Sequence, residues 1–168
     1  MITATIIVSV FYLVAGILLH LGLNRRYPRQ EIEPTVTVLV AARNEELNLP
    51  RCLESLSQLD YPVEKLHVMV LNDRSNDATG IIAHDFTKRF PFIRVLDISE
   101  DLSGLRGKMN ALAQGINHSS GDIIMITDAD CIVSRDWVRE TVQYFDHKTG
   151  MVAGMTLIDS DFSNKDIC

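Results

Sequence analysis

The stretch Asp122-Ile-Ile-Met-Ile-Thr-Asp-Ala-Asp130 joins an apolar segment to two carboxylates that stand one residue apart. Its apolar residues predict a buried strand over 123–127. Asp128 and Asp130 would then lie at the end of this strand, where two like charges repel each other unless a cation lies beside them. The stretch therefore favours an α/β domain that handles a metal-bound diphosphate.

The rest of the chain alternates between segments of strand character and segments of helical character. Apolar, mainly β-branched runs predict further strands over 35–41, 66–71, 92–98 and 151–158. Helical spacing and capping residues predict helices after an Asn48 cap, over 78–89, over 108–116, and from a Ser134 cap to about residue 147. The residues expected to face the core are Leu49, Leu53, Leu56 and Leu59 in the first helix and Ile81, Ile82 and Phe86 in the second. This order indicates a mostly parallel, Rossmann-like sheet with helices on both faces.

Acidic side chains follow three of the predicted strands. Glu45 and Glu46 come after the first strand, Asp73 after the second, and Asp128 and Asp130 after the fourth. Ligands of open parallel sheets bind at the carboxyl ends of the strands. We therefore expect these acids to converge on one ligand-binding edge.

The composition limits the classes of partner. The 168 residues suffice for one domain with an appendage, and the formal net charge is -6. Nucleic-acid binding needs a basic face, so the acidic balance argues against it. The same balance would repel a nucleotide diphosphate unless a divalent cation screened the two.

The three cysteines are scattered, without Cys-x-x-Cys pairs or zinc spacing, which fits a reducing compartment. Cys131, directly after Asp130, is either a ligand or nucleophile or a small residue that closes a tight turn.

The amino-terminal segment is free of charged side chains from residue 2 to residue 23, roughly the 20 residues that cross a bilayer as a helix. Arg25, Arg26 and Arg29 follow, and the positive-inside rule places them in the cytoplasm. A cleaved signal peptide normally has a basic start and a shorter apolar core, and the arginines argue against a buried core helix. We predict a transmembrane anchor over 1–24, a basic, proline-containing linker over 25–34 and a cytoplasmic nucleotide-binding domain over 35–168.

Four segments together resemble the family 2 glycosyltransferases, which have the nucleotide-binding GT-A fold. They are Val40-Ala-Ala-Arg-Asn-Glu-Glu46, Val70-Leu-Asn-Asp-Arg-Ser-Asn-Asp77, Gly107-Lys-Met-Asn-Ala-Leu-Ala-Gln-Gly115 and the Asp-x-Asp segment Thr127-Asp-Ala-Asp130. The resemblance implies sugar transfer from a nucleotide-diphosphate donor, usually with inversion and with Mg²⁺ or Mn²⁺. UDP is the family's commonest carrier, although GDP or dTDP would fit the same acids. Many members have Asn where Ala113 stands.

The resemblance also implies roles for the acids at the strand ends. Asp73 matches the residue that hydrogen-bonds the nucleotide base, although an Asx turn before a helix is the alternative. Asp130 matches the ligand of the metal that bridges the donor phosphates, and Asp128 would face the ribose or the water shell of that metal. Turn formation and capping are the alternative for this pair.

The remaining donor contacts are expected around the first and third motifs. Glu45 would contact the nucleoside, and Ala41 and Ala42 would offer backbone groups to the base. Lys108, and with it Arg106 directly before that motif, would lie near the diphosphate. A solvated loop acid and a solvated helix lysine are the alternatives for Glu45 and Lys108.

No catalytic base is assignable between Cys131 and Cys168, and the family places it after the metal motif. We therefore expect the donor-binding part of a longer enzyme; a noncatalytic nucleotide-sugar-binding module or a truncated inactive fragment is the alternative. A sugar nucleotidyltransferase usually opens with a glycine-rich, basic phosphate loop, whereas the loop after Ala41 has no glycine and one arginine. The sugar stays open. An anchored cytoplasmic site favours, by analogy, a lipid-linked or cell-envelope acceptor.

Overall fold

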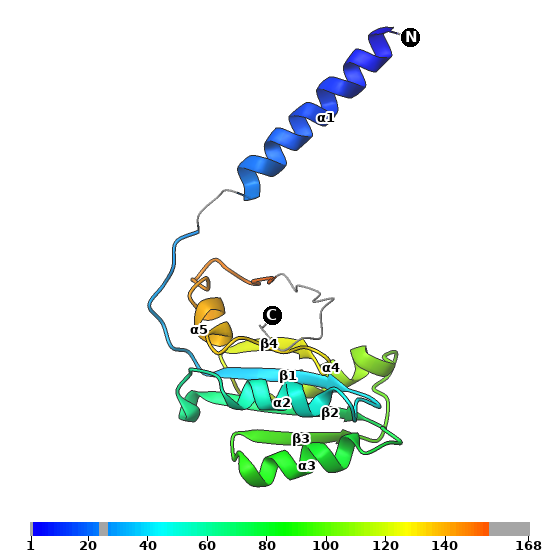
Figure 1. Ribbon diagram of the computed structural model, residues 1–168, viewed down its shortest axis with the longest axis vertical. Helices are drawn as coiled ribbons and strands as arrows, with labels where there is room; N and C mark the ends of the chain where they lie inside the picture. Colours follow the sequence, from blue (N-terminus) through cyan, green and yellow to red (C-terminus); the bar gives the residue numbers. More distant parts are fainter. Residues whose placement is uncertain (1, 24–26, 155–168) are drawn as a thin grey trace.

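The computed structural model describes residues 2–23 and 27–154, and Figure 1 shows their arrangement. Within these ranges the chain forms a four-stranded sheet in the order β3-β2-β1-β4, in which every neighbouring pair is parallel. The strands are β1 (Val36–Ala42), β2 (Leu66–Asp73), β3 (Ile93–Ile98) and β4 (Ile123–Asp128). The first four predicted strands and the parallel sheet are therefore confirmed.

The register of the sheet brings three strand ends to the same level. Ala41 of β1 pairs with Leu71 of β2 on one side and with Asp128 of β4 on the other. Asp73 is the last residue of β2, and Asp128 is the last residue of β4. The predicted convergence of acidic residues at one sheet edge therefore follows from the pairing.

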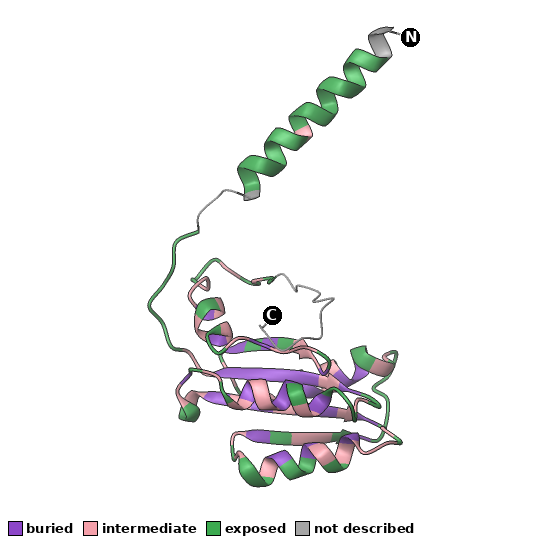
Figure 2. Cartoon of the chain, in the orientation of Figure 1, coloured by how far each residue is buried: buried purple, intermediate pink, exposed green. Residues whose placement is uncertain are grey.

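Helices cover both faces of the sheet (Figure 1). One face packs against α2 (Leu49–Ser57), α3 (Thr79–Arg89) and α5 (Trp137–Val142), and it forms the larger apolar cluster. The other face packs against α4 (Gly107–His118) through a smaller cluster. Successive strand residues point to opposite faces, so Val38 and Val40 join the first cluster while Leu39 joins the second. Figure 2 shows β1 and β2 buried along most of their length.

The start of α2 agrees with the sequence prediction, with one difference in its cap. Asn48 is the N-cap residue and proline occupies the first turn, but the Asn48 side chain makes no capping bond. Its Nδ2 donates instead to Glu45 Oε2 at 2.9 Å. Leu49, Leu53 and Leu56 are buried as predicted, and Leu59 packs partly buried against the core beyond the helix end.

The prediction for α3 was wrong at Ile81, whose side chain is 70% exposed. The buried positions of this helix are Thr79, Ala83 and Phe86, which are three or four residues apart and so share one face. Ile82 lies beside that face and packs partly buried against the core, whereas Ile81 points away from it.

The carboxyl-terminal elements also differ from the prediction. The helix expected from Ser134 to about residue 147 is only α5, and its N-cap residue is Asp136. Turns follow α5, and in one of them Asp146 Oδ1 accepts bonds from the Lys148 N–H and the Thr149 hydroxyl. Of the strand predicted over 151–158, residues 151–154 have no regular structure, and the remainder lies outside the described residues. A 3₁₀ helix, η1 (Val63–Lys65), precedes β2.

The amino-terminal helix α1 (Ile2–Leu23) extends away from the sheet (Figure 1). From Thr5 to Gly22 the mean hydropathy is 2.2, and every side chain except that of Ala15 is exposed. Its length and composition match those of a membrane-spanning helix, and an amino-terminal signal sequence meets the same criterion.

We expect Gly121→Ala to destabilise the domain by about 1–3 kcal/mol. A Cβ at this position would lie 2.7 Å from the Thr37 backbone nitrogen and 3.0 Å from the Thr35 carbonyl oxygen, so the entry to β4 must shift. Gly150→Ala is the matched control, because nothing lies within 4 Å of its added Cβ. Thermal unfolding of the detergent-solubilised chain, followed by circular dichroism, measures the difference. Equal melting temperatures for the two variants would contradict this packing.

Candidate functional site

A cavity of about 310 Å³ opens at the carboxyl ends of β1, β2 and β4, beside the first turn of α4. Its walls come from the loop after β1, the last residue of β2, the start of α4 and the segment that ends β4. The lining residues are Ala41, Ala42, Arg43, Glu45, Asp73, Gly107, Lys108, Ala111, Asp128, Ala129 and Asp130. This is the edge that the sequence predicted for ligand binding.

The cavity brings together almost all of the residues predicted to contact the donor. The predicted residues that line it are Ala41, Ala42, Glu45, Asp73, Lys108, Asp128 and Asp130. Arg106, the exposed N-cap residue of α4, is not among the lining residues, so the prediction that it contacts the donor gains no support from the cavity. Glu46 also lies outside, where its Oε2 accepts the Ala78 N–H at 3.0 Å.

Asp73 supplies a buried negative charge at the end of β2, with 3% of its surface exposed. Arg74 Nε donates to Asp73 Oδ1 at 2.9 Å, and Arg43 Nη1 lies 3.8 Å from Oδ2. A buried carboxylate needs such partners, because isolated burial of its charge is costly. Oδ2 faces the longer of the two contacts, so it is the oxygen best placed to accept an N–H group from a ligand.

Asp128 and Asp130 place two further carboxylates in the cavity. Lys108 Nζ donates to Asp128 Oδ1 across the cavity, and both side chains of this pair are about half exposed. Among the residues that the structure describes, Asp130 has no ion pair; its Oδ1 accepts a weak bond from Cys131 Sγ at 3.9 Å. Asp130 is therefore the most available anionic ligand at this edge.

These two carboxylates fit a hard divalent cation that shares its coordination with a ligand. Over residues 2–23 and 27–154, no cluster of three or more His, Cys, Asp or Glu side chains could enclose a metal ion. Mg²⁺ is typically held by one or two carboxylates, with substrate phosphates and water completing the octahedron. A pair of aspartates in an open cavity is suited to that mode of binding.

Cys131 closes the turn after β4. Its backbone N–H donates to the Asp128 carbonyl oxygen at 3.2 Å, as in a tight turn. This geometry matches the second of the two alternatives that the sequence left open for this residue.

Hydrogen bonds connect the loops after β1 and β2, and they involve side chains to which the sequence gave no role. Asn44, with a φ of 57°, accepts the Asn76 N–H at 2.8 Å, and Thr79 Oγ1 accepts the Glu45 N–H at 2.7 Å. The Thr79 hydroxyl in turn donates to Asp77 Oδ1 at 2.5 Å. Desolvation raises the pKa of Asp77, but the hydrogen bonds from Thr79 and from the Glu46 backbone outweigh it, and the pKa is lowered. Glu45 is thereby held at the cavity wall.

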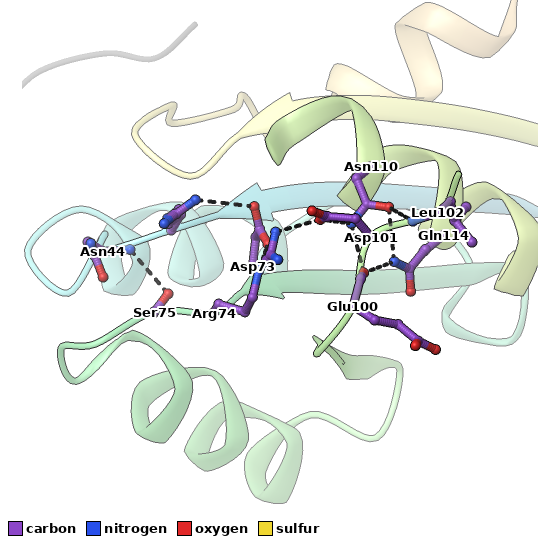
Figure 3. Close-up of polar contacts among 10 residues, drawn as sticks. Asn44, Asp73, Arg74, Ser75, Glu100, Asp101, Leu102, Asn110 and Gln114 are labelled. Carbon is purple, nitrogen blue, oxygen red and sulfur yellow. Dashed lines mark hydrogen bonds and ion pairs between the residues drawn. The ribbon is translucent and has the colours of Figure 1, made fainter. Parts of the chain in front are cut away.

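A second network, drawn in Figure 3, surrounds Arg74. Arg74 Nη2 donates to Asp101 Oδ1 at 2.8 Å, and the fully buried Asn110 donates to the same oxygen at 3.2 Å. The Asn110 side chain also binds the Glu100 carbonyl oxygen at 3.0 Å and the Leu102 N–H at 2.8 Å. The hydrogen bonds to Asp101 and then Asp73 raise the pKa of Arg74, so it stays charged.

Arg74 and Asn110 lie within two of the motifs, but nothing in the sequence assigned these two residues a function. The available signal was helical spacing, because Asn110 directly precedes Ala111 and both lie on the buried side of α4.

Comparison with known proteins relates this chain to sugar-transferring enzymes. A beta-monoglucosyldiacylglycerol synthase from Synechocystis sp. is 35% identical over 112 residues, which are 67% of this chain and 23% of the relative. The mannosyltransferase PcManGT from Pyrobaculum calidifontis, in complex with GDP-Man and Mn²⁺, superposes with a TM-score of 0.68 at 28% identity, over 83% of this chain and 42% of that one. S. aureus TarS 1–349 in complex with UDP-GlcNAc has a TM-score of 0.53 at 25% identity, over 64% of this chain and 30% of that one.

The chain spans about a quarter of the length of the curated relative and less than half of either solved chain. Its parallel sheet with covering helices is the GT-A-like architecture of these structural neighbours. The family model described as Glycosyl transferase family 2 matches residues 37–166, which is more than half of the chain. The chain therefore belongs to glycosyl transferase family 2.

Proposed function

We propose that this chain is the donor-binding part of a glycosyltransferase that moves a sugar from a nucleotide-diphosphate donor to an acceptor hydroxyl, with a divalent metal ion. The observation that carries the proposal is one cavity with two kinds of acidic group: a buried Asp73, and Asp128 with Asp130 at another strand end. A nucleotide base needs an acceptor for its N–H groups, and a diphosphate needs a cation. The two kinds of group meet these two needs.

The metal is proposed to be Mg²⁺ or Mn²⁺, held by Asp130 and, directly or through water, by Asp128. The Mn²⁺ in the mannosyltransferase complex supports a divalent ion. Such an ion would neutralise the charge that develops on the departing nucleoside diphosphate. Lys108 already contacts Asp128, so its ammonium is placed to pair with a phosphate oxygen as well. Glu45 and the backbone of Ala41 and Ala42 are proposed to line the nucleoside.

The base that accepts the proton of the acceptor hydroxyl is proposed to lie beyond residue 168. The acidic residues that line the described cavity, Glu45, Asp73, Asp128 and Asp130, are all proposed above to bind the donor or its metal. We propose a UDP-sugar as the donor, which the UDP-GlcNAc complex of a structural neighbour supports. Another neighbour is in complex with GDP-Man, so GDP is the nucleotide to compare with UDP in binding experiments.

The helix α1 is proposed to anchor the protein in a membrane, with residues 1–24 as the anchor, 25–34 as the linker and 35–168 as a cytoplasmic donor-binding domain. The exposed apolar surface of α1 supports the anchor, and the arginines that follow it in the sequence support the cytoplasmic side for the domain. A lipid-linked or cell-envelope acceptor is proposed, because one relative is named a beta-monoglucosyldiacylglycerol synthase.

Replacing Asp130 should remove the metal-dependent part of nucleotide binding. For Asp130→Asn we expect about tenfold or greater loss of UDP affinity with Mn²⁺ present and no change when EDTA removes the metal. Isothermal titration calorimetry on the detergent-solubilised chain measures both affinities. Asp136→Asn is the control, because this exposed residue makes no side-chain capping bond and lies outside the cavity. Undiminished metal-dependent binding by Asp130→Asn would contradict the assignment.

Replacing Asp73 should weaken the binding of the base and leave the binding of the metal-bound diphosphate unchanged. Asp73→Asn removes a charge-assisted acceptor for the base, so UDP affinity should fall by roughly tenfold or more. Binding of manganese pyrophosphate, which has no base, should stay within about twofold in the same titrations. A parallel loss of pyrophosphate binding would show that Asp73 does not act at the base.

A further inference from the structure

Arg74 combines an unusual backbone conformation with two ion pairs at the edge of the cavity. Its φ is 54°, in the left-handed region that residues with a Cβ rarely occupy and that glycine occupies freely. Its guanidinium bridges Asp73 Oδ1 at 2.9 Å and Asp101 Oδ1 at 2.8 Å. Arg74 thus has a backbone conformation that is unfavourable for arginine, while its side chain contacts two carboxylates.

The contacts of Arg74 continue to the helix at the other side of the cavity. Asp101 accepts a bond from Asn110, which lies on α4 one turn from its start (Figure 3). Lys108 lies two residues earlier on the same helix and contacts Asp128 at the end of β4. Side chains therefore connect Asp73 to the helix that carries Lys108.

The bridge also changes what Asp73 offers to a ligand. Arg74 occupies Oδ1 with a direct hydrogen bond, whereas the Arg43 guanidinium is 3.8 Å from Oδ2. A distance of 3.8 Å is too long for a hydrogen bond, so Oδ2 is the available acceptor. Uracil presents one imide N–H to such an oxygen, while guanine presents two adjacent N–H groups that need two acceptors.

We propose that Arg74 is a positioning residue that, with Asp101 and Asn110, fixes the Asp73 carboxylate to accept one N–H group and thereby favours a uracil base over guanine. This inference rests on the proposed donor-binding function and adds to it the residue that sets base selectivity. Arg74 acts through Asp73 and does not itself contact the donor.

The test compares Arg74→Gly with Arg74→Lys in the full 168-residue chain in detergent. Glycine accepts the left-handed φ, which offsets part of the cost of leaving the buried Asp73 carboxylate without its direct partner, so the melting temperature should fall by only a few degrees. The affinity for UDP with Mn²⁺ should nevertheless fall by about tenfold, and the preference for UDP over GDP should shrink, since Oδ1 is freed. Arg74→Lys keeps the positive charge and the left-handed φ but lacks the planar guanidinium. It should therefore keep only part of the UDP affinity and part of the preference for UDP over GDP. Calorimetric titrations with UDP and with GDP give the affinities.

A double-mutant cycle tests whether Arg74 acts through the network. Asp101→Ala should weaken UDP binding, and adding it to Arg74→Gly should cause no further loss, because the two residues act as one unit. Asp101→Ala also decides the matter if Arg74→Gly does not fold, since it keeps the pair between Arg74 and Asp73 and Asp101 lies outside the cavity lining.

Wild-type UDP affinity and an unchanged UDP-to-GDP ratio in Arg74→Gly, or in Asp101→Ala, would overturn the inference and leave the proposed function standing. Failure of the unaltered chain to bind either nucleotide with Mn²⁺ would overturn both.

Discussion

Parallel pairing of β1 with both β2 and β4 is the constraint on which the rest of the site depends. Because the three strands end at one level, the side chains that follow them share one edge, and three of those side chains are aspartates. Like charges at one edge repel each other, so each carboxylate must find a cation, a hydrogen-bond donor or water. The sheet therefore fixes where the acids lie, and the loops decide how their charge is balanced.

The three carboxylates are balanced in different ways. Asp73 is buried and has two arginine partners, and Asp128 is half exposed and paired with Lys108. Asp130 is exposed to the cavity and has no ion pair among the described residues. This gradient runs from a buried group held by protein cations to an exposed group without a protein cation in the described part of the chain. It agrees with the proposed division between a base, recognised by geometry, and a diphosphate, recognised through charge.

Much of this arrangement could be predicted from the sequence, because apolar runs define parallel strands and parallel strands have a common ligand edge. That rule alone predicted that Asp73, Asp128 and Asp130 lie at this edge. The contacts of Arg74, Asp101 and Asn110 could not be predicted, since they depend on a left-handed backbone at Arg74 and on a loop folded around a buried amide.

The errors have physical causes as well. The apolar character of Ile81 suggested a core position, although the helical phase set by Thr79, Ala83 and Phe86 turns it outward. The helix near the carboxyl end was predicted too long, because the turn made by Asp146 follows soon after α5. Arg106 was grouped with Lys108 by proximity in sequence, whereas the start of α4 separates them between solvent and cavity.

The central claim is that the acidic sheet edge binds a divalent ion together with the diphosphate of a nucleotide. A crystal structure of the chain with Mn²⁺ and UDP tests it most directly, because anomalous scattering locates the ion. We predict an anomalous peak between the Asp130 carboxylate and the diphosphate, with the uracil N–H at hydrogen-bond distance from Asp73. An ion or a nucleotide bound away from this cavity would contradict the account.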